Sequence, residues 1–258
     1  MLAFYRQYAY FRYGYKNSTI MKPHLTNCLW TALITLALSA CGGRTSTLSV
    51  TVEGDGWSKL KTDSMNLTWI QDNPGNKLMP VALFPDAPDK LIEQLHLQEG
   101  IPSSVSTFLL EKGGKLILFD TGNGAPDSRL ARRLAYLNTS PENIRYIYLT
   151  HFHGDHIGGM MRGDTVVFPN AEVYASKAEY EAWMKMPKEQ NALVVKTMEA
   201  YKDRLHLFEF GDTLPGGVVA LDAAGHTPGH TAYRAGQFLI VGDLMHGVAL
   251  QREHPDIC

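Results

Sequence analysis

Thr150-His151-Phe152-His153-Gly154-Asp155-His156 holds three imidazoles and one carboxylate within six consecutive positions, 151–156. Imidazole nitrogens and carboxylate oxygens are ligands that zinc favours. Isolated histidines are usually surface residues or hydrogen-bonded core residues, but so dense a run of ligand-type side chains is typical of neither. We therefore predict that four residues of this stretch bind metal: His151, His153, Asp155 and His156.

The stretch offers too many ligands for a single ion. A zinc ion takes about four ligands at ~2.0–2.2 Å, and six adjacent residues cannot all surround one ion without strain. Two ions sharing the stretch is the simpler solution, and each ion then needs ligands from elsewhere in the chain. His226 and Asp243 both follow a glycine after an apolar run, which makes them candidates for these further ligands.

Hydrophobic patterns place the stretch at the end of a strand. Residues 144–149 are apolar and partly β-branched, which predicts a buried strand that ends where the ligands begin. Residues 104–110 and 115–119 flank Lys112-Gly113-Gly114, a hairpin pattern that delivers Asp120 at a second strand end. Further strands are predicted at 66–72, 77–84, 171–175, 205–208, 218–221, 231–234 and 238–241, and helices at 128–137, 176–185 and 189–202. The helix at 176–185 opens with Ser176-Lys177-Ala178-Glu179, a capping-box pattern.

Length and charge exclude several classes of protein. At 258 residues, 45% of them hydrophobic, the chain can bury a substantial core, and one main domain is expected. The formal net charge is only −2, and no run of lysine or arginine stands out. Because a nucleic-acid-binding surface needs concentrated positive charge, we expect a small-molecule substrate and no nucleic-acid partner.

The N-terminal part of the chain predicts export. Residues 29–38 are apolar but too short to cross a bilayer, which takes roughly 20 residues, so we interpret 21–40 as a signal peptide. Leu38-Ser39-Ala40-Cys41-Gly42 resembles the lipobox of bacterial lipoproteins. That resemblance implies cleavage before Cys41, a lipid on Cys41 and a membrane-anchored periplasmic protein. The alternatives are a plain secretory signal and a buried core segment.

Two segments flank this signal. The charged start of a signal peptide directly precedes its apolar core, whereas residues 1–20 are rich in aromatic side chains and contain no acid, so we interpret them as an upstream mis-start, with Met21 as the natural start. An aromatic anchor at a membrane surface is the alternative. Residues 41–58 are rich in Gly, Ser and Thr, which predicts a flexible tether before a domain at 59–258.

The histidine stretch, with Asp120-Thr121-Gly122 before it and His226 and Asp243 after it, resembles the metallo-β-lactamase superfamily over roughly residues 60 to 258. The resemblance implies an α+β fold, the αβ/βα four-layer sandwich with metals at the sheet edge. By motif match His151, His153 and His226 would hold the first of two zinc ions, Asp155 and His156 the second, and Asp243 would bridge both. Asp120 would support the ligands by hydrogen bonding, and Thr227 and His230 either do likewise or only pack the loop.

The resemblance also implies the chemistry. Two metal ions about 3.5–4 Å apart can hold a water, lower its pKa from 15.7 towards 7 and polarise the oxygen of the group attacked. A hydroxide bridging the ions would then hydrolyse an ester, lactone, phosphotriester or β-lactam, with Asp155 and Asp243 as the catalytic carboxylates. His153 argues against the redox branch, which has a glutamate there. Thr107-Phe108-Leu109-Leu110 and Gly242-Asp243-Leu244-Met245-His246 most resemble exported methyl parathion hydrolase-like and lactonase-like members.

One ligand of the family pattern is not found in the chain. The pattern places a further histidine several tens of residues beyond the bridging aspartate, whereas the sequence ends at Cys258. We therefore expect a domain that lacks its last strands and helix. His246 or His254 is a candidate substitute, although His246, three residues from Asp243, is expected beside the ligands or in the pocket. The alternative function is a catalytically impaired, lipid-anchored metal-binding fragment.

Overall fold

The computed structural model describes residues 49–257, with side chains from residue 55 onward. The interpretations of 1–20 as a mis-start, of 21–40 as a signal peptide and of Cys41 as a lipidation site concern residues outside this range and stay predictions. Within the described range, no helix has the length and apolar character needed to cross a membrane.

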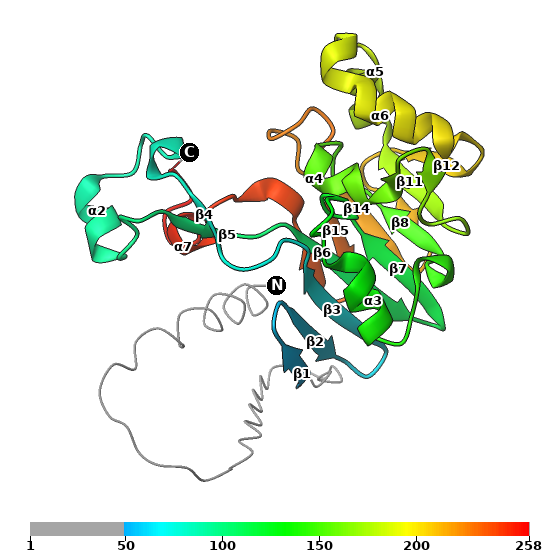
Figure 1. Cartoon of the computed structure of the whole chain (residues 1–258), viewed down its shortest axis with the longest axis horizontal. Coiled ribbons are helices and arrows are strands. Elements are labelled where there is room, and N and C mark those ends of the chain that lie inside the picture. Colours follow the sequence, from blue (N-terminus) through cyan, green and yellow to red (C-terminus); the bar gives the residue numbers. More distant parts are fainter. Residues whose placement is uncertain (1–48, 258) are drawn as a thin grey trace.

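A mixed eight-stranded sheet forms the centre of the molecule (Figure 1). Its order is β1-β2-β3-β6-β7-β8-β11-β12. The strands from β1 to β7 pair antiparallel, whereas β7, β8, β11 and β12 run parallel to one another. Parallel neighbours end at the same edge of a sheet, so the carboxyl ends of β7 and β8 lie side by side. The bounds are β1 Ser49–Gly54, β2 Trp57–Lys61, β3 Met65–Gln71, β6 Ser106–Lys112, β7 Lys115–Phe119, β8 Tyr146–Tyr148, β11 Glu172–Ser176 and β12 Leu205–Phe208.

A second, antiparallel sheet packs against the first. It has the order β13-β14-β15-β16, with bounds Thr213–Leu214, Val218–Asp222, Thr231–Ala235 and Phe238–Ile240. The apolar core between the sheets is built from strand residues of both, and at its centre the ring of Tyr233 lies 5.4 Å from Phe119 and 5.6 Å from Tyr148. This arrangement confirms the predicted sandwich of two sheets.

Helices cover the other face of the large sheet. α3 (Leu130–Tyr136), α4 (Gly154–Ile157), α5 (Lys177–Met184) and α6 (Lys188–Ala200) contribute to a core that includes Leu134, Ile157, Trp183 and Met198. The remaining short elements are the β9–β10 hairpin (Met161–Arg162, Thr165–Val166) and the 3-10 helices η1 Val81–Leu83, η2 Pro141–Asn143, η3 Gly158–Met160, η4 Lys202–Arg204 and η5 Gly242–Leu244.

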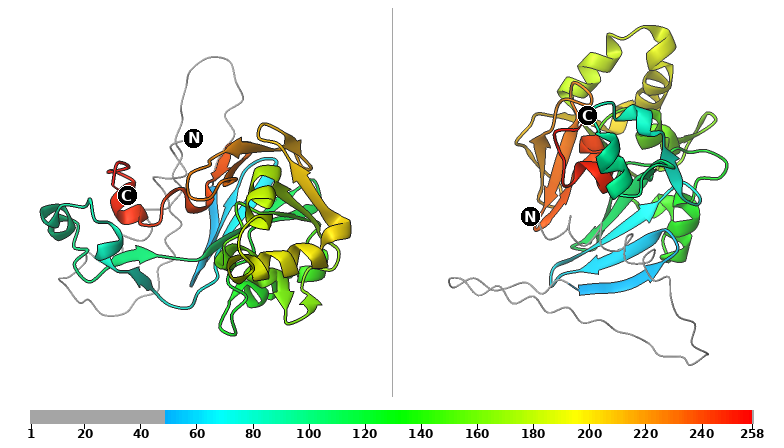
Figure 2. Two further views of the ribbon diagram at one scale, coloured as in Figure 1. Left: turned by 90° about the horizontal axis from the view of Figure 1, so that it is seen from above. Right: turned by 90° about the vertical axis from the view of Figure 1, so that its left-hand side faces the viewer.

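A small lobe extends away from the two sheets (Figures 1 and 2). It contains the β4–β5 pair (Lys77–Met79, Ile101–Ser103), α2 (Asp89–Gln94) and α7 (Val248–Gln251). Its own apolar core comprises Phe84, Ile92, Leu97, Ile101, Leu250 and Ile257. Because α7 follows η5 directly, the lobe is joined to the segment that carries Asp243.

Two predicted boundaries are wrong. The domain does not begin at residue 59, because β1 lies within the predicted tether 41–58 and β2 begins in it at Trp57. The two strands already pair in the large sheet, where Trp57 is buried. The strand predicted at 77–84 stops at Met79, because Pro80 precedes a 3-10 helix. The other predicted strands and helices are present, with ends shifted by a few residues.

Candidate metal centre

The histidine loop, residues 150–156, leaves the large sheet directly after β8. Asp120 follows β7, the parallel neighbour of β8, and therefore lies beside this loop. The second sheet supplies the loop at residues 225–230, between β14 and β15, and η5 with Asp243 after β16. Four chain segments from both sheets thus meet at one edge of the sandwich, as the sequence predicted for Asp120, His226 and Asp243.

Three imidazoles converge in a first group. His153 Nδ1 lies 2.9 Å from His151 Nε2 and 2.9 Å from His226 Nε2. All three nitrogens lie within 4.8 Å of one another, an arrangement that can hold a metal ion. His151 is fully buried, whereas His153 and His226 are partly exposed, so the group opens towards the surface on one side.

A second group lies against the first and contains His151, His156 and Asp243. His156 Nε2 is 3.2 Å from Asp243 Oδ1, and His226 Nε2 is 3.6 Å from Asp243 Oδ2. The carboxylate of Asp243 therefore faces both sets of histidines. Asp155 is less close, with Oδ1 3.9 Å from His156 Nε2, and belongs to none of the three candidate ligand groups.

His246 forms a third candidate group with His226 and Asp243. Its Nε2 lies 3.6 Å from Asp243 Oδ2, and its ring centroid lies 4.8 Å from that of His226. This places His246 at the mouth of the site, as expected for a pocket residue, on the side of His226 rather than of His156. His254, the other predicted substitute, is in none of the groups.

The charge states of these residues fit a bound cation. Burial lowers the pKa of His151 and His153, and it lowers the pKa of His226 to about 4, so all three present neutral imidazoles. Although burial opposes its charge, the hydrogen bond and charge of His156 hold the pKa of Asp243 well below its usual range. Neutral imidazole nitrogens beside an ionised carboxylate are the donor set that a divalent metal requires.

Asp120 orients histidines of both groups. Its Oδ2 accepts hydrogen bonds from Thr150 Oγ1 and His156 Nδ1, both at 2.8 Å, and its Oδ1 accepts one from the Thr150 backbone N–H at 2.8 Å. Because the Thr150 hydroxyl donates to Asp120, it is an acceptor for His151 Nδ1 at 3.0 Å. The Nδ1 protons of both histidines then face Thr150 and Asp120, and their Nε2 atoms point into the site. Asp120 also raises the pKa of His156, although burial opposes the charge.

His230 and Thr227 differ in what they contribute. His230 Nδ1 donates to the Ala223 carbonyl at 3.0 Å, and its Nε2 accepts the backbone N–H of Asp243 at 3.2 Å, so His230 supports the main chain of a candidate ligand. Of the two roles expected for Thr227, packing of the loop fits its side chain better, because its buried hydroxyl has no hydrogen-bond partner among the described residues. Its carbonyl instead accepts from the N–H groups of Gly225 and His230, which closes the turn.

Two buried carboxylates beside the site, Glu179 and Asp72, were not predicted from the sequence. Glu179 was interpreted as half of a capping box, but only the Ser176 half is present, with Ser176 Oγ accepting the Glu179 N–H at 3.0 Å. The Glu179 side chain turns instead towards the histidine loop. Asp72, fully buried after β3, accepts the N–H groups of Asn123 and Leu130, both at 2.9 Å, and so holds the turn that follows Asp120. Its position at a strand end was the one available signal.

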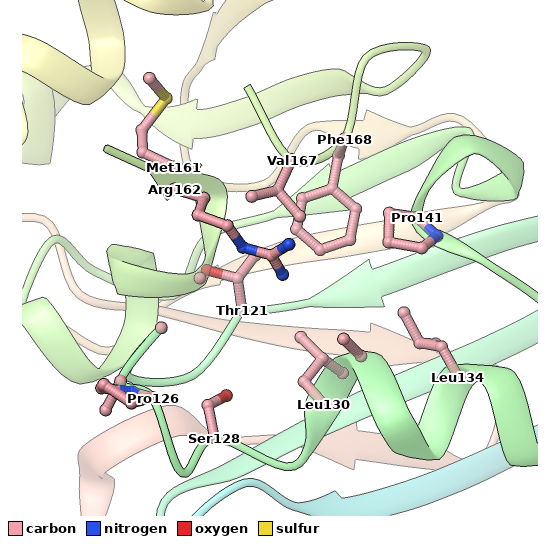
Figure 3. Close-up of a pocket in the computed structure, with 14 residues that line it drawn as sticks. Thr121, Pro126, Ser128, Leu130, Leu134, Pro141, Met161, Arg162, Val167 and Phe168 are labelled. Atoms are coloured by element: carbon pink, nitrogen blue, oxygen red, sulfur yellow. The ribbon is translucent and has the colours of Figure 1, made fainter. Parts of the chain in front are cut away.

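A cavity of about 400 Å³ lies against the turn that follows Asp120, and Thr121 and Pro126 of this turn line it (Figure 3). It is lined mainly by apolar side chains of α3 and of the β9–β10 region, including Leu130, Met161 and Phe168, and the side chain of Arg162 lies among them. None of the candidate metal ligands lines it. The metal centre and this cavity are therefore separate features, although Thr121, which lines the cavity, donates its hydroxyl to the carbonyl of His156 at 2.9 Å.

Comparison with known proteins agrees with this geometry. The family profile described as the metallo-beta-lactamase superfamily matches residues 100–255. The "Beta-lactamase-like protein 2 homolog" of Caenorhabditis elegans is 30% identical over 129 residues, which cover 49% of this chain and only 37% of that protein. Among solved structures, the hydrolase AbOPH has a TM-score of 0.64, with 28% identity and 76% of each chain covered. AidC, described as a dizinc quorum-quenching lactonase in complex with a product, has a TM-score of 0.68, with 26% identity and coverage of 78% of this chain and 79% of that one.

Proposed function

The chain belongs to the metallo-β-lactamase superfamily, and we propose on that premise that it is a zinc-dependent hydrolase of small esters, with lactones as its first substrate class. The observation that carries the proposal is the placement of Asp243, whose two carboxylate oxygens face His156 on one side and His226 on the other. A carboxylate between two groups of histidines suits a centre with two ions. The resemblance to the lactonase AidC supports lactones ahead of phosphotriesters and β-lactams.

The residues of the site would have different roles. His151, His153 and His226 would hold one zinc ion, His156 and Asp155 the other, and Asp243 both. Zinc bound there would lower the pKa of a water towards 7 and polarise the carbonyl oxygen of the substrate. Asp120 and Thr150 keep protons on the Nδ1 atoms of His151 and His156, and His230 holds the main chain of Asp243 in place. The side of the site that opens to the surface, beside His246, would admit the substrate.

The test is metal content together with turnover on a substrate panel. We expect two zinc ions per chain and hydrolysis of acyl homoserine lactones faster than of an aryl ester, a phosphotriester or a β-lactam. A chelator should abolish the activity and added zinc should restore it. One tightly held ion without turnover on any substrate would instead support the metal-binding alternative. Two ions with no hydrolysis of any ester would contradict the proposed activity.

We also propose that the protein is exported and anchored to a membrane by a lipid on Cys41. The support is the sequence 38–42, which resembles a lipobox. In a bacterial host given a labelled fatty acid, Cys41→Ser is expected to lose the label and to move from the membrane fraction to the soluble fraction. Cys28→Ser, which changes a cysteine on the other side of the apolar run, is the matched control and should keep both. Retention of the label by Cys41→Ser would rule the anchor out.

A further inference from the structure

Glu179 is a buried carboxylate on the first turn of α5, with 1% of its surface exposed. Its oxygens accept three hydrogen bonds from N–H groups. Oε1 accepts the backbone N–H of Phe152 at 3.0 Å and the indole N–H of Trp183 at 2.7 Å, and Oε2 accepts the backbone N–H of Gly229 at 2.8 Å. None of these contacts caps the helix. The side chain therefore stabilises the segments whose N–H groups it accepts.

Two of these donors belong to the loops that carry the first group of histidines. Phe152 lies between His151 and His153 in the chain, and Gly229 lies in the 225–230 loop with His226. The same helix end holds Gly229 from a second side, because Ser176 Oγ donates to the Gly229 carbonyl at 2.8 Å. One side chain of α5 therefore ties together two loops that come from different sheets.

Contacts around Gly229 leave little room for movement. A Cβ at this position would collide with the backbone of Glu179 and with Ser176 Oγ, so the 225–230 loop packs directly on the helix. Trp183, the third donor, places its ring centroid 5.7 Å from that of His153 in an edge-on contact. Contacts with α5 therefore fix the spacing of His153 and His226, whose nitrogens are 2.9 Å apart.

The charge of Glu179 is not paired with a cationic side chain among the described residues. Lys177, on the same helix, pairs with Glu209 instead. An ionised carboxylate buried without a positive partner is costly, even when it accepts several hydrogen bonds. The nearby group formed by His151, His153 and His226 is where a cation is proposed to sit.

We propose that Glu179 is a positioning residue for the metal centre: its carboxylate fixes the His151–His153 pair relative to His226, and its buried negative charge offsets the cation that these histidines hold. The inference rests on the metal site of the proposed function. It assigns a part in metal affinity to a residue outside the ligand set, which acts on the two loops through their main chain and not through a hydrogen bond to a histidine ring.

The experiment is zinc affinity, measured on metal-stripped protein by competition with a chromophoric chelator. Glu179→Gln keeps the shape of the side chain, removes the charge and turns one acceptor into an NH₂ group that faces N–H donors. We expect its zinc Kd to rise by about 10–100-fold. Glu181→Gln, the same change at an exposed position of α5, is the matched control and should stay within about twofold of wild type.

Thermal unfolding of the metal-free variants separates positioning from folding alone. A lower melting temperature for Glu179→Gln with an unchanged zinc Kd would overturn the proposal, because a merely structural role predicts that result. If Glu179→Gln does not fold, Trp183→Phe takes its place: it removes one donor, keeps the carboxylate, and should weaken zinc binding several-fold. Unchanged zinc binding in Trp183→Phe would then overturn the proposal. Failure of wild type to bind zinc would remove the proposed metal site itself, a result distinct from either.

Discussion

Asp243→Asn is expected to lower kcat/KM for the best lactone by at least about 1,000-fold and to reduce the zinc content from two ions per chain to one. Asn has the same size and keeps the backbone N–H that donates to His230 Nε2. What it loses is the negative charge between His156 and His226. The charge stabilisation that a metal ion supplies to a hydrolytic transition state amounts to several kcal/mol, and each 1.36 kcal/mol is tenfold in rate. Losing about 4 kcal/mol of it accounts for the expected decrease.

Asp222→Asn is the matched control for this variant. Asp222 lies exposed at the end of β14, in the same sheet that delivers Asp243, and its Oδ1 accepts the nearby Ala224 N–H at 2.9 Å. We expect it to keep both zinc ions and wild-type turnover. The placement of Asp243 between two ions would be disproved by an Asp243→Asn protein that still binds two ions and hydrolyses the lactone within tenfold of wild type.

The histidine loop could be predicted because the residues that identify it lie close together in the sequence. Ligand types, glycines and the apolar strand before them all lie within residues 144–159. His226 and Asp243 are 70 and more residues further along, and only the family resemblance suggested that the fold returns them to the same edge. Physical reasoning from the chain alone gives no distance between segments of two different sheets, so their convergence required the structure.

Two errors show tertiary contacts overriding local patterns. Ser176-Lys177-Ala178-Glu179 is a sound capping box by sequence, and its Ser half is present, but Glu179 gains three N–H donors by turning towards the histidine and 225–230 loops. The Gly-, Ser- and Thr-rich composition of 41–58 indicated a tether. Yet Ser49–Gly54 contains alternating valines and a β-branched threonine, and it pairs with β2 at the edge of the sheet. The average composition of residues 41–58 therefore did not reveal the short strand that lies within them.

Asp120→Asn should weaken the binding of both zinc ions, because Asp120 acts on His156 directly and on His151 through Thr150. Replacing a carboxylate that orients histidine ligands typically costs 10–100-fold in metal affinity, so loading of both ions should weaken by about 10²–10⁴-fold. Asn also suits the backbone, since Asp120 has a φ of 58°, a conformation that Asn tolerates well. The measurement is chelator competition for each ion, with kcat and KM for the lactone.

Asp72→Asn is the control that makes this result interpretable. Asp72 is likewise a fully buried aspartate that accepts hydrogen bonds from main-chain N–H groups, at Asn123 and Leu130, but it faces no candidate ligand. Both substitutions should destabilise the fold by a similar amount, because each sets an NH₂ group against buried donors, at about 1–3 kcal/mol. Only Asp120→Asn should also loosen zinc. If the two variants weakened zinc binding equally, the effect would come from a less stable turn after Asp120, which both side chains support. Asp120 would then not set the proton positions of His151 and His156.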